Sequence, residues 1–199
     1  MEPDAAPRGE PITVVSGLPR SGTSMMMSML VAGGMSAVTD DARSPDEDNP
    51  RGYFEDRRVK AMTKNPDRTW LAETRGKAIK IVSRLLPELP PIYDYSIVFM
   101  RRDIREILAS QDKMLARRGG TPSVPDERMQ ALFERDLERT RVLLQTATHF
   151  KAIDVDYGAV LASPLGEALR ISAFLERDLD IDRMVAVVDA ALYRNRVES

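Results

Sequence analysis

The chain has 199 residues, 43% hydrophobic and 30% charged, which is ordinary globular usage and predicts one domain with a sizeable core. The 29 basic side chains against 31 acidic ones leave a net charge of −2, which argues against a protein that coats nucleic acid. The absence of Cys and a single His exclude disulfides, cysteine nucleophiles and multi-histidine metal sites.

The start of the chain is polar and proline-rich, and we expect a flexible tail over residues 1–11 before a single domain over 12–199. No apolar stretch resembles an export signal or approaches the ~20 residues that a membrane helix needs. We therefore expect a cytoplasmic protein whose partners include neither a membrane nor nucleic acid.

Strand-like and helix-like segments then alternate along the chain. Short apolar, β-branched runs predict buried strands at 12–16, 77–82, 96–100 and 151–155. Helical spacing of apolar residues predicts helices at 23–32, 103–118, 125–149 and 163–177. Turn-forming residues predict flexible segments at 34–52 and 118–125. This alternation predicts an α/β fold in three layers, with a central, mainly parallel sheet flanked by helices.

The segment between the first strand and the first helix reads GLPRSGTS, over residues 17–24. Backbone N–H groups of such a loop, with a helix dipole behind them, form a cradle for an anion. The spacing matches the Walker A pattern, but Thr23 replaces its lysine, which argues against a plain kinase or NTPase. Arg20 can supply a positive charge instead, and the alternative interpretation is an ordinary turn.

PRSGTS after a leading strand resembles the 5′-phosphosulfate loop of the P-loop sulfotransferases, which use 3′-phosphoadenosine-5′-phosphosulfate (PAPS). The resemblance implies that the donor nucleotide is bound by Pro19, Arg20, Ser21, Gly22, Thr23 and Ser24. It also implies a P-loop sulfotransferase fold and a transferase that needs no metal.

The family's second signature is an Arg at the end of a later strand, followed eight positions on by a Ser. Both bind the 3′-phosphate that distinguishes PAPS from ATP, and Arg102 and Ser110 have this spacing. Arg101 is a competing candidate, and Ile104 replaces a proline of the family pattern. Taken alone, Arg102 is also typical of a solvated strand end, and Ser110 of an exposed helix surface.

Weaker similarities extend along the chain. Lys80 matches a family lysine that precedes the catalytic histidine, but Val82 stands where that histidine belongs. Tyr157 matches a tyrosine that contacts adenine, although both residues also suit purely structural roles. The family's C-terminal GxxGxxK element is not visible, and Arg194 and Arg196 are either its replacement or solvated charges.

The acceptor's proton requires a base, and the resemblance identifies none. We expect Glu55 to take this role beside the catalytic Arg20 and Lys80, with Asp40, Asp41 and Asp48 as rivals. The alternative interpretation is that Glu55 is an acidic residue in the first turn of a helix.

Two aromatic residues are left without a clear role. The one histidine, His149, follows a long helix and suits a helix-terminus cation better than a base. The only tryptophan, Trp70, suits either a stacking surface for adenine or acceptor, or an anchor in the core.

The sequence thus favours a PAPS-dependent sulfotransferase that acts on a hydroxyl or amine of a small molecule or glycan. One alternative is a small-molecule kinase or NTPase with a degenerate phosphate loop, which would need Mg²⁺ near carboxylates such as Asp40 or Asp103. The other is a nucleotide-binding module without catalytic activity. Acceptor identity and oligomeric state do not follow from the sequence.

Overall fold

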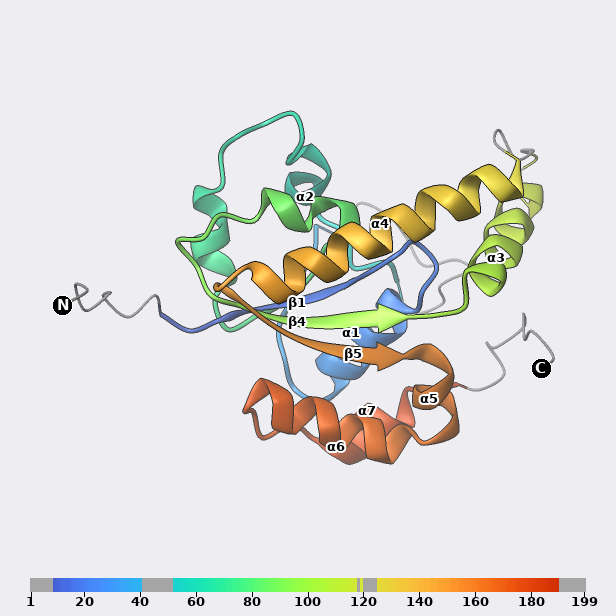
Figure 1. The fold of residues 1–199 in the computed structure, drawn as a ribbon. Helices are drawn as coiled ribbons and strands as arrows, with labels where there is room; N and C mark the ends of the chain where they lie inside the picture. The colour runs from blue at the N-terminus through green and yellow to red at the C-terminus, as the bar shows by residue number, and fades with distance from the viewer. Residues whose placement is uncertain (1–8, 41–51, 118, 120–124, 190–199) are drawn as a thin grey trace.

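A computed structural model of the chain describes residues 9–40, 52–117, 119 and 125–189. Its centre is a five-stranded sheet in the order β2-β3-β1-β4-β5, in which every pair of neighbours is parallel (Figure 1). The strands are β1 Ile12–Gly17, β2 Ala37–Val38, β3 Ala78–Lys80, β4 Tyr95–Arg101 and β5 Phe150–Asp156. The predicted α/β architecture is confirmed, and the sheet is parallel throughout rather than mainly so.

The four predicted strands correspond to β1, β3, β4 and β5. The sequence missed β2, which lies in the segment 34–52 that was expected to be flexible. Two residues are too few to show an alternating pattern, and β2 forms because Ala37 and Val38 pair with Ala78 and Ile79 of β3. The remainder of that segment, 41–51, lies outside the described residues, as do 118 and 120–124.

The helices that the sequence predicted are also present. They are α1 Thr23–Ala32, α3 Ile104–Arg117, α4 Asp126–Thr146 and α6 Pro164–Leu175. The sequence missed α2 Arg57–Ala61, α5 Tyr157–Ala162, α7 Ile181–Ala186 and the 3₁₀ helices η1 Thr69–Thr74 and η2 Ser83–Glu88. Each missed helix has five or six residues, too few to establish a 3.6-residue period.

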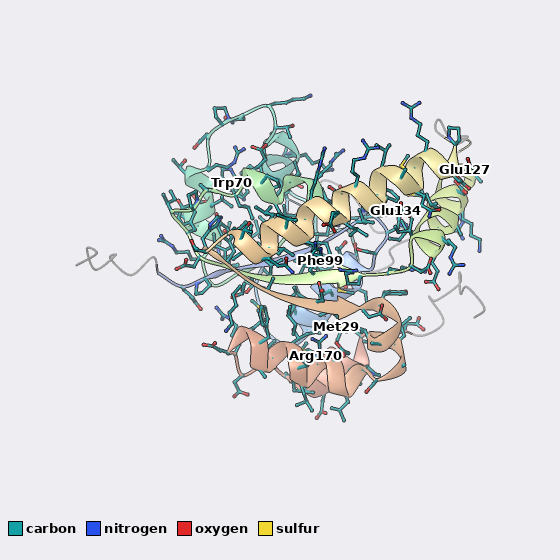
Figure 2. All side chains as sticks on the ribbon, viewed as in Figure 1. Met29, Trp70, Phe99, Glu127, Glu134 and Arg170 are labelled. Carbon is teal, nitrogen blue, oxygen red and sulfur yellow. The ribbon has the colours of Figure 1, made fainter. Side chains whose placement is uncertain are left out.

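Side chains of each strand alternate between two cores, one on each face of the sheet. Ile97 and Phe99 of β4 pack toward α4 and the 3₁₀ helices, whereas Val98 and Met100 pack toward α1, α5, α6 and α7. Figure 2 shows Phe99 on the α4 side of the sheet and the fully buried Met29 of α1 on the other. Helices therefore cover both faces, as a parallel sheet requires.

In the described part of the chain, none of the helices has the length and apolar composition needed to cross a membrane.

We predict that the buried side chains of the sheet dominate stability. Ile97→Ala on β4 removes three buried carbons at a position that is 0% exposed, and it should lower the free energy of unfolding by roughly 2–5 kcal/mol. Ile92→Ala is the matched control: this side chain is 64% exposed, and its loss should change the free energy by less than about 0.5 kcal/mol. Urea denaturation followed by circular dichroism measures both; equal costs would contradict the assignment of the core.

Candidate functional site

The loop at the carboxyl end of β1 has three residues with positive φ angles. Gly17, Arg20 and Gly22 have positive φ angles of 146°, 68° and 102°, and α1 begins directly after them at Thr23. In the described part of the chain no side chain caps the start of α1, and its first turn carries no acidic residue. The first N–H groups of α1, and the positive end of its dipole, thus point into the loop without a negative side chain on them.

The phosphate loop and the second motif meet in space. Arg20 Nε donates a hydrogen bond to Ser110 Oγ at 3.0 Å, and Arg102 Nη1 donates to the Arg20 carbonyl oxygen at 3.2 Å. The contact exists because β1 and β4 are neighbouring parallel strands, so that both chains leave the sheet at the same edge. Residues 82 and 90 positions apart in sequence therefore form one cluster.

Arg102, rather than Arg101, belongs to this cluster. The Arg101 side chain is 45% exposed and lies 3.7 Å from Asp154 on the neighbouring strand. The Arg102 side chain is 8% exposed and forms an ion pair with Glu106, with 3.0 Å between Nε and Oε2. Sequence reasoning missed Glu106, although its position four residues after Arg102 is the spacing of an ion pair within one helical turn.

Tyr157 forms the third side of the cluster. The Arg102 guanidinium lies 4.4 Å from the centre of its ring, a cation–π contact. Burial raises the pKa of the Tyr157 hydroxyl above its ordinary value, while the nearby Arg102 and Arg20 act in the opposite direction. The phenol is therefore neutral at physiological pH and keeps its proton for donation.

Lys80, the last residue of β3, reaches the phosphate loop from the other side. Its Nζ donates to the Tyr53 carbonyl oxygen and lies 3.4 Å from Ser24 Oγ in the first turn of α1. The loop is thereby flanked by cations on both sides: Lys80 on one and Arg20 with Arg102 on the other. The structure does bring these sequence-predicted residues together.

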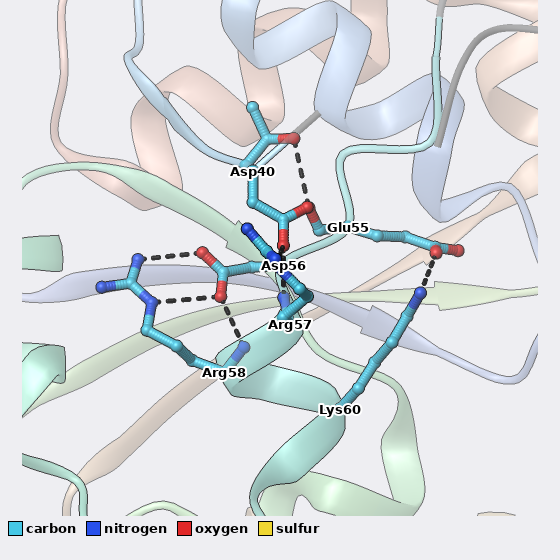
Figure 3. A network of polar contacts seen from close by, with 7 residues as sticks. Asp40, Glu55, Asp56, Arg57, Arg58 and Lys60 are labelled. Atoms are coloured by element: carbon cyan, nitrogen blue, oxygen red, sulfur yellow. Dashed lines mark hydrogen bonds and ion pairs between the residues drawn. The ribbon is translucent and has the colours of Figure 1, made fainter. Parts of the chain in front are cut away.

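Glu55 lies in a network of charged residues at the start of α2 (Figure 3). Its carboxylate pairs with Lys60, with 2.5 Å between Oε2 and Nζ, and its side chain is 21% exposed. Its carbonyl oxygen accepts a hydrogen bond from the Asp40 backbone N–H. Because Asp56 is the N-cap of α2, Glu55 precedes the helix, and the first-turn interpretation is wrong.

The rivals of Glu55 differ in their placement. The Asp40 carboxylate accepts a hydrogen bond from Arg57 Nε at 2.8 Å and is 16% exposed. Asp41 and Asp48 lie outside the described residues, as do Arg194 and Arg196.

A cavity of about 420 Å³ connects Glu55 with Lys80, and we call it the Lys80 cavity. Its lining residues are Glu55, Asp56, Val59, Lys60, Thr63, Lys80, Val82, Arg84 and Leu85. Val82, which the sequence resemblance matched to the family histidine, thus lines the same space as Lys80. A molecule in the Lys80 cavity would lie beside the residue that contacts the phosphate loop.

Two residues that the sequence singled out lie elsewhere. The His149 carbonyl accepts from the Tyr95 backbone N–H at the amino-terminal edge of the sheet, and the His149 ring packs on Phe150. Trp70 of η1 packs under the Arg58 guanidinium at 4.7 Å, so it is an anchor and not a lining residue of the Lys80 cavity.

Comparison with known proteins identifies the fold. No family model and no curated protein sequence matches the chain. Among solved structures, the chain is similar to the sulfotransferase domain from the Synechococcus PCC 7002 olefin synthase, with a TM-score of 0.54 and 14% sequence identity. The match covers 96% of this chain and 89% of that domain. The chain therefore has the fold of a sulfotransferase domain, as the sequence resemblance implied.

We predict that Gly22 is required both for its backbone angle and for the space it leaves. A Cβ at Gly22 would lie 2.5 Å from Tyr157 Cδ2, whereas at Gly34, with a similar φ of 104°, nothing lies within 4 Å. Both Gly→Ala variants strain the backbone, but Gly22→Ala must also displace Tyr157, and it should cost roughly 1–3 kcal/mol more than Gly34→Ala. Chemical denaturation compares the two variants. Equal costs would show that Tyr157 does not pack against the loop.

Proposed function

We propose that this chain is a sulfotransferase that moves a sulfuryl group from PAPS to a hydroxyl or amine of an acceptor. The observation that carries the proposal is the hydrogen bond between Arg20 of the phosphate loop and Ser110 of the second motif. A loop for a 5′-phosphosulfate and a pair of residues for a 3′-phosphate meet there at one edge of the sheet. The fold of a sulfotransferase domain supports the same assignment.

The charges around the loop suit a nucleotide with two anionic groups. Arg20, Lys80 and Arg102 bring three cations to the loop, and the buried carboxylate of Glu106 pairs with one of them. In our proposal the loop N–H groups and the hydroxyls of Thr23 and Ser24 hold the 5′-phosphosulfate. Charge-assisted hydrogen bonds from arginine to phosphate are among the strongest available to a protein.

In our proposal the second sequence motif binds the second anionic group of the donor. Arg102 and Ser110 hold the 3′-phosphate, and Tyr157 contacts adenine. A nucleotide without that phosphate would offer Arg102 no anionic group beyond the carboxylate of Glu106, with which it already pairs.

PAPS supplies the sulfuryl group, and the acceptor oxygen or nitrogen displaces adenosine 3′,5′-bisphosphate from sulfur. In this reaction negative charge develops on the bridging phosphate oxygen as its bond to sulfur breaks. Lys80 and Arg20 flank the loop in positions that suit stabilisation of this charge. Preorganised cations in a partly buried site are an effective way to lower such a barrier.

We propose Glu55 as the base that accepts the proton of the acceptor. It lines the same cavity as Lys80, which places its carboxylate where an acceptor beside Lys80 could be reached. Asp40 remains the rival: like Glu55 it forms an ion pair, but it does not line the Lys80 cavity.

A kinase or NTPase is the second candidate function, because Lys80 beside Ser24 could replace the lysine that the loop lacks. The carboxylates nominated for Mg²⁺ are engaged otherwise: Asp40 pairs with Arg57, and hydrogen bonds from Arg105 lower the pKa of Asp103. Within the described residues, no group of three His, Asp or Glu could hold a metal ion. A nucleotide-binding module without catalytic activity would bind the same nucleotide but would transfer no sulfuryl group.

We predict that adenosine 3′,5′-bisphosphate stabilises the protein in the absence of Mg²⁺, and far more than ADP does. At a concentration of about 100 times Kd, binding adds roughly 2.7 kcal/mol, which is a rise of about 5 °C or more in melting temperature for a chain of this size. Differential scanning fluorimetry measures the shift. Equal shifts for the two nucleotides, or a shift that needs Mg²⁺, would favour the kinase instead. Stabilisation without sulfuryl transfer to any acceptor would favour the binding module.

Discrimination between these nucleotides should depend on Arg102. Arg102→Gln should weaken the bisphosphate roughly 10- to 100-fold and leave adenosine 5′-phosphate nearly unchanged, because only the contact with the 3′-phosphate is lost. Arg101→Gln is the matched control and should change neither affinity. Since Arg102→Gln leaves Glu106 without its ion pair, the double variant Arg102→Gln/Glu106→Gln separates loss of recognition from loss of fold.

For the base, we predict that Glu55→Gln lowers kcat at least about 100-fold, with the affinity for adenosine 3′,5′-bisphosphate unchanged. The amide has nearly the shape of the carboxylate but cannot accept the proton. Asp40→Asn, measured in the same assay of sulfuryl transfer, should retain most of the activity. The reverse result would assign the base to Asp40.

A further inference from the structure

The Lys80 cavity combines an apolar wall with charged residues. Val59 and Leu85 are each 6% exposed, and together with Val82 they give the cavity an apolar surface between α2 and η2. The charged lining residues are Glu55, Asp56, Lys60, Lys80 and Arg84. An occupant therefore needs an apolar part, and the charges decide what else it carries.

Four of these five charged groups have identified polar partners. Asp56 accepts from Arg58 through both carboxylate oxygens, at 3.1 and 2.8 Å. Glu55 pairs with Lys60, and Lys80 contacts the Tyr53 carbonyl and the phosphate loop. Arg84 is the remaining charged residue of the Lys80 cavity. Among the described residues, no carboxylate forms an ion pair with it.

The backbone under Arg84 is firmly held. Its neighbours in η2, Ser83 and Leu85, are buried, and the Ser83 hydroxyl donates a hydrogen bond to Asp136 of α4. Arg84 itself is exposed, so its guanidinium can reach a group at the mouth of the Lys80 cavity without a cost of burying charge. A guanidinium binds a carboxylate or another oxyanion through two parallel N–H···O bonds, which gives selectivity for such groups.

We infer that the acceptor carries an anionic oxyacid group, in the simplest case a carboxylate, on an apolar chain. Arg84 binds the oxyanion, Val59, Val82 and Leu85 contact the chain, and the accepting hydroxyl lies toward Lys80 and Glu55. This inference rests on the proposed function for the statement that the occupant is an acceptor, but the preference for an anion is a property of the Lys80 cavity alone.

A pair of matched compounds tests the inference by binding. 8-Hydroxyoctanoate and 1,8-octanediol differ only in the carboxylate at one end, and isothermal titration calorimetry compares them with and without saturating adenosine 3′,5′-bisphosphate. We expect the carboxylate compound to bind about fivefold more tightly, the size of a partly exposed ion pair. Arg84→Gln should abolish this preference, and Arg84→Lys should retain part of it. Arg139→Gln, which removes an exposed arginine of α4, is the charge control and should preserve it.

Equal binding of the two compounds, binding of neither, or a preference that survives Arg84→Gln would overturn the inference. None of these results involves sulfuryl transfer, so they leave the proposed function to its own nucleotide test. A carboxylate preference that depends on Arg84, in a protein that fails to distinguish the bisphosphate from ADP, would support an anion site and overturn the proposed donor.

Discussion

The parallel register between β1 and β4 is the constraint on which the candidate site depends. Gly17 pairs with Met100, so the phosphate loop and Arg102 leave the sheet side by side. A strand advances ~3.3 Å per residue, and a slip of two residues would move one motif by about 6.6 Å relative to the other. That displacement exceeds the reach of the hydrogen bonds that Arg20 makes with Ser110 and Arg102 makes with the loop. Both strands are buried along almost their whole length, and their side chains pack into the two cores on either face, so that packing fixes the register and the core sets the geometry of the site.

Within this geometry, Glu106 balances the charge of Arg102. Both side chains are more than nine-tenths buried, and an arginine in that position without a carboxylate would be strongly destabilising. Glu106 therefore keeps Arg102 beside the Arg20 carbonyl and the Tyr157 ring. The unfavourable free energy of removing water from the Arg102 guanidinium is part of folding. A ligand that binds to the folded protein does not have to supply it.

Much of this arrangement could be predicted from the sequence, because its signals are local. Apolar runs identified β1 and β4, and the resemblance to the sulfotransferase family pointed to Arg102 and Ser110, which follow the end of one predicted strand. The elements that escaped prediction, among them β2, α2 and η2, are short and form through pairing and packing with distant residues. The Lys80 cavity was not predicted because Arg84 and Lys60, two of its lining residues, belong to these short elements. No local sequence pattern indicates that the two side chains line the same cavity. Glu106 is different, since its spacing from Arg102 was visible in the sequence.

The position of Trp70 gives the protein an optical property. It is the only tryptophan in the chain, so the indole emission of the whole molecule comes from one place. Its ring lies under Arg58, which also grips Asp56 at the wall of the Lys80 cavity. Because the Arg58 guanidinium lies 4.7 Å from the indole ring, a displacement of Arg58 should change the fluorescence of Trp70. The fluorescence therefore reports on the wall of the Lys80 cavity without an added label.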